Sequence, residues 1–65
     1  MTNCVRELRG QNEGMTQQSL ADAVGVTRQT IVAMETGTYT PSLALAIRIA
    51  RVFDCNVEDV FELND

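Results

Sequence analysis

The sequence predicts a small all-α domain built from five short helices. Three observations support this prediction. Helix-capping residues and glycines recur at short intervals, the apolar residues between them follow a helical period, and no segment alternates apolar and polar residues for long enough to form a strand. The chain has 65 residues, which is enough for one small domain. We therefore expect a single domain that spans residues 1–65.

Each predicted helix begins after a residue that can cap it. The five predicted helices cover residues of about 4–14, 17–24, 28–36, 43–53 and 57–61. Their predicted caps are Asn3 or Thr2 for the first and Thr16, Thr27, Ser42 and Asn56 for the others. Such side chains accept hydrogen bonds from the free amide groups of the first helical turn. Gly25 and Gly37 follow the second and third helices, where a residue with positive φ is often required.

The composition argues against catalysis and metal binding. The chain has no histidine and only two cysteines, Cys4 and Cys55, which are too few ligands for tetrahedral zinc. Ser19 and Ser42 have no histidine or lysine that could act as a general base. We therefore predict no enzyme, no metal, no cofactor and no small-molecule substrate. The two thiols are expected to be inert, with a disulfide or a redox role as the alternatives.

Hydropathy and charge predict a cytoplasmic protein with an acidic C-terminal segment and no membrane partner. No apolar run approaches the roughly 20 residues that span a bilayer, and no signal peptide is present. All five basic residues are arginines, and they lie in residues 1–53 with four acids, whereas residues 54–65 carry five acids and no base. Basicity from arginine alone, beside an excess of acids, favours a halophilic archaeal source. A GC-rich genome is the alternative explanation.

Residues 16–37 form the segment with the clearest functional pattern. Two capped helices flank a turn at Val24-Gly25-Val26, which is the arrangement of a helix-turn-helix unit. The later helix of this unit is the predicted helix of residues 28–36. Its outer stripe presents side chains suited to the DNA major groove, and they are Arg28, Gln29, Val32 and Ala33. Arginine can bind guanine and glutamine can bind adenine through two hydrogen bonds each, and small apolar side chains can contact a thymine methyl group. An ordinary solvated surface is the alternative interpretation of this stripe.

Three segments carry a resemblance to a known family. They read Met15-Thr-Gln-Gln-Ser-Leu-Ala, Val24-Gly-Val-Thr-Arg-Gln-Thr-Ile and Glu35-Thr-Gly-Thr-Tyr-Thr-Pro-Ser-Leu-Ala-Leu-Ala. Together they resemble the Cro and phage-repressor (XRE) helix-turn-helix family, and the similarity covers essentially the whole chain. The short, stand-alone archaeal and bacterial regulators are the most similar members.

The resemblance implies a transcriptional regulator, expected to be a repressor, that binds a two-fold symmetric operator in double-stranded DNA as a homodimer. By position in the family pattern, the base-contacting residues are Arg28, Gln29, Val32 and Ala33. The backbone-contacting residues are Gln17, Thr27, Thr38 and Tyr39, and Thr16 is expected to join them because it begins a helix whose free amide groups can bind a phosphate. An antitoxin or a protein-docking module of the same fold is the alternative function.

Two features depart from the family pattern. The segment from Arg9 to Gly14 is one residue longer than usual. We expect this residue to lengthen the first helix or to bulge from its end, and to disturb a contact between Arg9 and Glu35 that the resemblance implies. The loop at Thr38 and Tyr39 also lacks the lysine or arginine that is usual there.

The end of the chain is rich in apolar residues for so short an element. The apolar side chains concerned, our predicted dimer interface, are Val57, Val60, Phe61 and Leu63. We expect Val57 and Val60 to reach the core, and Phe61 and Leu63 to stay exposed. An exposed apolar patch usually marks an interface, and a two-fold dimer is the commonest assembly.

Overall fold

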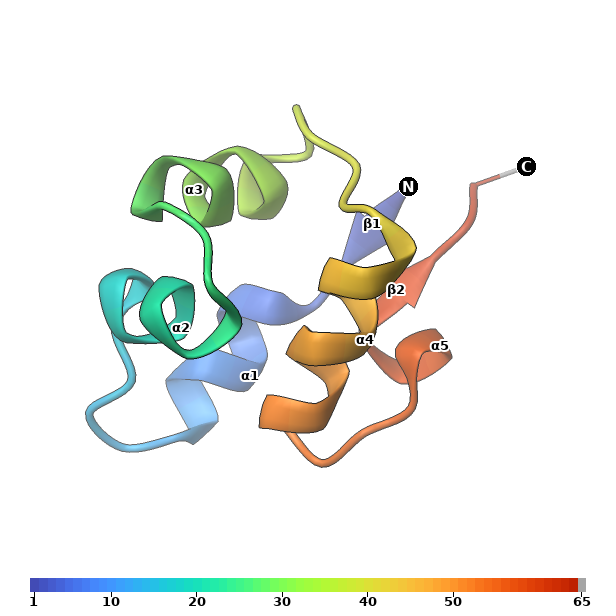
Figure 1. The fold of residues 1–65 in the computed structure, drawn as a ribbon. Coiled ribbons are helices and arrows are strands. Elements are labelled where there is room, and N and C mark those ends of the chain that lie inside the picture. The colour runs from blue at the N-terminus through green and yellow to red at the C-terminus, as the bar shows by residue number, and fades with distance from the viewer. Residues whose placement is uncertain (65) are drawn as a thin grey trace.

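The computed structural model describes residues 1–64, and five short helices surround one apolar core (Figure 1). The helices are α1 (Val5–Gln11), α2 (Gln17–Val24), α3 (Arg28–Thr36), α4 (Leu43–Val52) and α5 (Val57–Val60). The predicted fold class is confirmed. Among the described residues, no helix has the length and apolar character needed to cross a membrane.

Four of the predicted caps lie at the starts of their helices, and they are Thr16, Thr27, Ser42 and Asn56. Hydroxyl oxygens of Thr16, Thr27 and Ser42 accept hydrogen bonds from backbone amides in the following turn, at 3.0, 3.4 and 3.2 Å. Gly25 and Gly37 end α2 and α3 with φ of 77° and 85°, a left-handed conformation that glycine adopts without steric cost. The turn between α2 and α3 is therefore set by a glycine and a capping threonine only two residues apart.

Helix α1 is shorter than the sequence predicts. It ends at Gln11 instead of near Gly14, so the predicted lengthening is wrong. Residues 12–16 form the loop before α2, and Gly14 in this loop has a φ of 79°. At the other end the N-cap is Cys4, although Asn3 Oδ1 still accepts a hydrogen bond from the Val5 amide at 3.1 Å.

Two short strands join the ends of the chain, and the expectation of no strand is wrong. β1 (Thr2–Asn3) pairs antiparallel with β2 (Phe61–Glu62). The Cys4 amide extends the pairing by donating to the Val60 carbonyl oxygen at 3.0 Å. Strands of two residues are too short to leave an alternating pattern in the sequence. Their pairing places the two ends of the described chain side by side (Figure 1).

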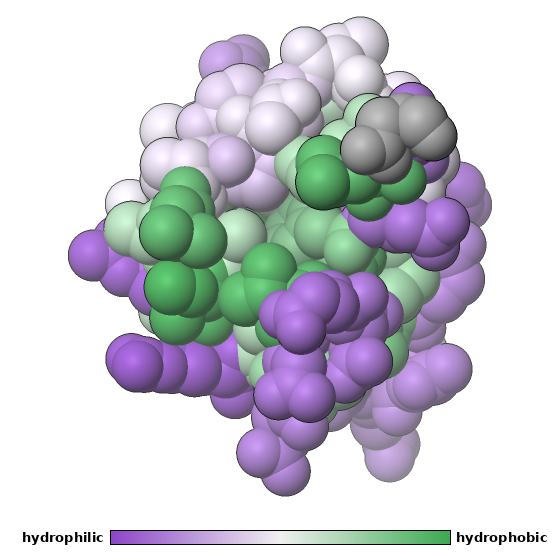
Figure 2. Space-filling view, turned by 90° about the vertical axis from the view of Figure 1, so that its right-hand side faces the viewer, coloured by the Kyte–Doolittle hydropathy of each residue, from purple (hydrophilic) through white to green (hydrophobic). Residues whose placement is uncertain are grey.

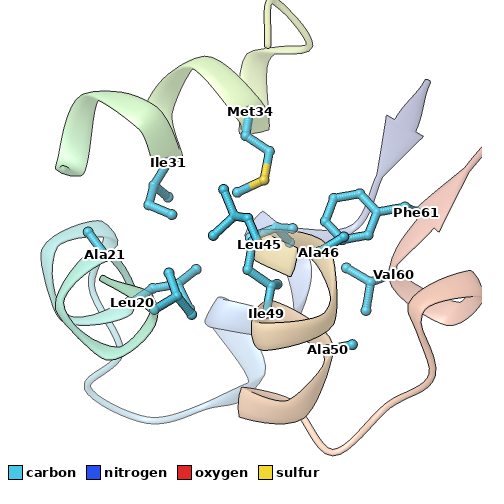
Figure 3. Close-up of a cluster of buried hydrophobic side chains, with 12 residues drawn as sticks. Leu20, Ala21, Ile31, Met34, Leu45, Ala46, Ile49, Ala50, Val60 and Phe61 are labelled. Atoms are coloured by element: carbon cyan, nitrogen blue, oxygen red, sulfur yellow. The ribbon is translucent and has the colours of Figure 1, made fainter. Parts of the chain in front are cut away.

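The core gathers residues from every helix. Its buried members are Val5, Leu20, Ala21, Val24, Ile31, Met34, Leu45, Ala46, Ile49, Ala50, Val60 and Phe61. Figure 3 shows Ile31 and Met34 of α3 pointing toward Leu45 of α4. Because one side of α3 is fixed in the core, its opposite side faces solvent.

The structure corrects the predicted exposure at the C-terminal end. Phe61 is only 7% exposed, so the expectation that it lies open to solvent is wrong. Phe61 pairs with Asn3 across the strands and packs in the core with Val60. Val57 also packs against the core, whereas Leu63 is 74% exposed. Of the predicted interface residues, Val60 and Phe61 are therefore used inside the protomer.

Candidate nucleic-acid interface

The outer side of α3 presents the four residues that the sequence predicts as base-contacting. Arg28 and Gln29 are exposed, and Val32 and Ala33 are half-buried. Residues at these spacings lie on one stripe of a helix. The structure therefore brings the four side chains together on one surface.

This stripe forms the floor of an open hollow between α2, α3 and the loop that follows α3. The hollow has a volume of about 690 Å³, and its lining residues are Gln18, Arg28, Gln29, Val32, Ala33, Thr36 and Thr38. Gln18 and Thr36 were missed by the sequence reasoning. The sequence could have indicated both residues. Gln18 is the second residue of α2, and Thr36 lies about one turn beyond Val32 and Ala33.

A second hollow of about 530 Å³ lies beside the first, at the start of α2. Three arginines, Arg6, Arg9 and Arg28, contribute to its lining. The Thr16 amide donates to the Ser19 hydroxyl at 2.8 Å, so it is not free for an anion. The amides of residues 17 and 18 have no acceptor within the helix, because the first turn of a helix leaves its amide groups unpaired.

A nearly buried ion pair joins α1 to the last turn of α3. Arg9 Nε lies 2.7 Å from Glu35 Oε2, and Arg9 Nη2 lies 3.1 Å from Oε1. The two side chains are 16% and 5% exposed. The expected disturbance of this contact is wrong, because Arg9 lies within α1 and its guanidinium reaches Glu35 directly.

Two glutamine contacts extend the ion pair to the start of α3. Gln17 Nε2 donates to Glu35 Oε1 at 3.0 Å. Arg28 Nε donates to Gln17 Oε1 at 3.4 Å. The side chain of Gln17 is thus directed inward by two neighbours, and its backbone amide remains the group that points out of the helix end.

The ion pair shifts the pKa of both of its members. Burial by itself raises the pKa of the Glu35 carboxyl, but the hydrogen bonds from Arg9 and Gln17, together with the charges of Arg9 and Arg6, outweigh burial and lower the pKa below its ordinary value. The hydrogen bond to Glu35 raises the pKa of the Arg9 guanidinium. Both groups are therefore charged across the neutral range.

Three of the predicted backbone-contacting residues lie around the two ends of α3, whereas Thr16 and Gln17 lie at the start of α2. Thr27 is exposed at its start, and Thr38 and Tyr39 are exposed just after its end. The Thr38 hydroxyl donates to the Ala33 carbonyl oxygen at 3.1 Å, which holds the loop against the helix. Tyr39 is 41% exposed and does not line either hollow.

The two cysteines are free and lie away from these hollows. The Cys4 thiol donates to the Asp59 carbonyl oxygen, and the Cys55 thiol donates to the Phe53 carbonyl oxygen, both at 3.3 Å. Burial raises the pKa of the Cys4 thiol, and the nearby Glu7 charge raises it further. A raised pKa reduces the reactive thiolate fraction at neutral pH.

The comparison with protein families decides the class. A sequence model described as Helix-turn-helix matches residues 5–60, which include both α2 and α3. The chain belongs to the Cro and phage-repressor type of the helix-turn-helix family. The resemblance seen in the sequence is confirmed.

This helix-turn-helix chain has archaeal and bacterial relatives of nearly its own length. A protein of Archaeoglobus fulgidus is 52% identical over 65 residues, which are 100% of this chain and 91% of that protein. YgzD of Bacillus subtilis is 49% identical over 100% of this chain and 97% of its own length. A protein of Methanothermobacter thermautotrophicus is 52% identical over 100% of this chain and 94% of its own. All three are named uncharacterized HTH-type transcriptional regulators.

The fold of this helix-turn-helix chain is also similar to a solved structure. The solution structure of the SOS-response transcriptional repressor LexA from Eubacterium rectale matches with a TM-score of 0.77 and 25% identity. The match covers 85% of this chain, which spans only 57% of that LexA chain.

Acid should remove the stability that Glu35 supplies. Because the folded-state pKa of Glu35 is lowered, its contribution is fully present above the unfolded-state value of about 4.5 and is lost as pH falls through the folded-state value. We expect the free energy of unfolding of the wild type to fall more steeply below about pH 4.5 than that of Glu35→Gln. Denaturant titrations across the acid range measure this, with Glu13→Gln, an exposed carboxyl, as the control. Parallel profiles for the wild type and Glu35→Gln would contradict the assignment.

Proposed function

We propose that this chain is a sequence-specific DNA-binding transcriptional regulator that reads the major groove with α3. The observation that carries the proposal is the stripe of Arg28, Gln29, Val32 and Ala33, which floors an open hollow. The opposite side of α3 is fixed in the core. A helix held in this way can enter a groove about 12 Å wide without losing its own packing. The family and the names of the relatives support the same conclusion.

Two polar side chains supply the proposed base contacts. Arg28 uses only its Nε toward Gln17, so its terminal nitrogens are available for guanine. Gln29 is exposed and offers a donor and an acceptor for adenine. The half-buried Val32 and Ala33 provide an apolar surface against which a thymine methyl group can pack.

The proposed phosphate contacts lie on either side of this stripe. The backbone amide of Gln17 opens at the start of α2, where the helix dipole favours an anion. The hydroxyl groups of Thr16, Thr27 and Tyr39 are the proposed neutral donors, and the Thr38 hydroxyl can join them only by leaving the Ala33 carbonyl oxygen. Contacts of this kind set the orientation of a protein on the duplex, whereas base contacts give the sequence preference.

We also propose that the chain binds as a homodimer on a two-fold symmetric operator and acts as a repressor. A chain of this size buries only roughly 60% of its unfolded surface, and a dimer adds to that. The likeness to the LexA repressor supports the repressor role. Since Val60 and Phe61 are used in the core, the dimer surface must rely on Leu63 and other exposed residues.

Removing the proposed base contacts should weaken specific binding and leave the fold intact. We expect Arg28→Ala and Gln29→Ala each to cost about 1–3 kcal/mol on an operator selected from random DNA, because both side chains are exposed. Affinity for a scrambled duplex reports the non-specific part, and Gln11→Ala on α1 is the matched glutamine control. Unchanged operator affinity for both variants would contradict the role of α3 and would favour the protein-docking alternative.

Binding should depend only weakly on salt. Of the arginines at the second hollow, Arg9 is neutralised by Glu35 and Arg28 is the proposed base contact, which leaves Arg6 for phosphates. One cation per protomer predicts a slope of about −2 for a dimer when log affinity is plotted against log salt concentration. We propose that such binding suits the salt-rich cytoplasm of a halophilic archaeon, where the Debye length is only about 3 Å. Titrations in KCl measure the slope, and a value near about −10 would contradict the proposal.

A further inference from the structure

One side of the molecule carries apolar and charged side chains that nothing in the protomer covers. It is the side that displays α4, α5 and β2, and Figure 2 shows apolar side chains reaching its surface among hydrophilic ones. We call it the α4–β2 face, and we assign to it Leu43, Ile47 and Arg51 from α4, with Arg48 at its edge, and Val57, Glu58, Glu62 and Leu63 from the C-terminal part, all exposed or half-buried.

The apolar members are unusually open. Leu43 is 72% exposed and Leu63 is 74% exposed, the two highest values among the large apolar residues that the structure describes as exposed. Leu43 and Ile47 are four residues apart on α4, so they share one stripe of that helix. Each half of the face therefore presents its own leucine, one on α4 and one just beyond β2.

The two halves of the face carry opposite charge. Arg48 and Arg51 are the charged residues of α4, whereas Glu58 and Glu62 lie on α5 and β2. Asp65, the last of the acids counted in the sequence, lies outside the described residues. Within residues 1–64 the structure pairs only Arg9 with Glu35. The charges of the face thus have no partner in the protomer.

We propose that the α4–β2 face binds the same face of a second copy of this chain, with α4 of each protomer against α5 and β2 of the other. This inference rests on the homodimer proposed above. If both α3 helices are to face one DNA duplex, the two-fold axis must keep them on the same side of the dimer. A two-fold axis with this direction can pass between α4 and α5. It then places the basic half of each protomer against the acidic half of the other.

The arrangement of the elements makes this exchange favourable along the whole face. The N-terminal end of α4 lies at the level of β2, and its C-terminal end lies at the level of α5 (Figure 1). Leu43 therefore meets Leu63 of the second copy at one end of the face. Arg51 meets the acidic α5 of the second copy at the other end.

The area that a stable interface needs indicates that the charged side chains of the face lie within the contact. A specific interface takes about 800 Å² from each partner, which is roughly a fifth of the 4372 Å² accessible surface of this small chain. Two leucines and the partly covered Ile47 and Val57 supply only part of that area. The neighbouring charged side chains must therefore lie within the contact, where opposite charges set the register and like charges oppose association.

Charge reversal on either half tests the inference. The α4 reversal is Arg48→Glu with Arg51→Glu, and the C-terminal reversal is Glu58→Arg with Glu62→Arg. Each creates like charges at both symmetric contacts, so we expect the dissociation constant of the homodimer, measured by sedimentation, to rise about 100-fold. An equimolar mixture of the two variants should regain nearly the wild-type affinity, because the α4 acids of one then face the C-terminal arginines of the other.

Two control variants separate the effect of where the charges lie from the effect of net charge on dimerisation. Arg6→Glu with Arg28→Glu has the net charge of the α4 reversal, and Glu13→Arg with Asp22→Arg has that of the C-terminal reversal. All four residues are exposed and lie outside the α4–β2 face. These controls should dimerise as the wild type does, and circular dichroism checks that every variant is folded.

The possible failures are distinguishable. A wild type that stays monomeric at micromolar concentration would overturn the homodimer itself. A dimeric wild type whose reversed variants associate as tightly as their controls, or whose mixture regains no affinity, would leave the homodimer standing and overturn the assignment of this face. Phe61→Asp would be uninformative, because Phe61 is part of the core.

Discussion

The ion pair between Arg9 and Glu35 is the interaction on which the geometry of the proposed DNA-binding surface depends. Glu35 lies in the last turn of α3, where the helix dipole disfavours a carboxylate, and its side chain is only 5% exposed. A charge in such a place is stable only when it is paired and hydrogen-bonded. Arg9 supplies two hydrogen bonds and the opposite charge. The pair therefore fixes α3 against α1.

Both ends of α3 are tied to other elements by polar contacts. At its start, Arg28 reaches Gln17, which itself binds Glu35. At its end, the Asn3 side chain donates to the Met34 carbonyl oxygen at 3.0 Å, and Asn3 belongs to the strand that pairs with β2. The proposed reading helix and the proposed dimer face are thus joined through one short sheet. In the proposed dimer, this connection would relate the spacing of the two α3 helices to the dimer face.

Local signals in the sequence were sufficient for the presence and order of the helices, although not for the bounds of α1, and for the outward stripe of α3. Hydroxyl caps such as Thr27 and glycines such as Gly37 act within one turn, so their effect can be predicted without the rest of the chain. The misplaced features depend on contacts between distant residues. The strands form only because residues 2–3 meet residues 61–62, and this pairing buries Phe61. The Arg9–Glu35 contact also joins distant residues, one in α1 and one in α3, and the length of the segment after Arg9 does not reveal it.

The central claim is that two copies of α3, related by a two-fold axis, read DNA sequence. Selection of bound duplexes from a random DNA pool by the purified chain tests it most directly. The account predicts an enriched inverted repeat whose half-site centres lie about one helical turn apart, roughly 34–36 Å. Binding without any enriched sequence, or enrichment of a single asymmetric site, would contradict it.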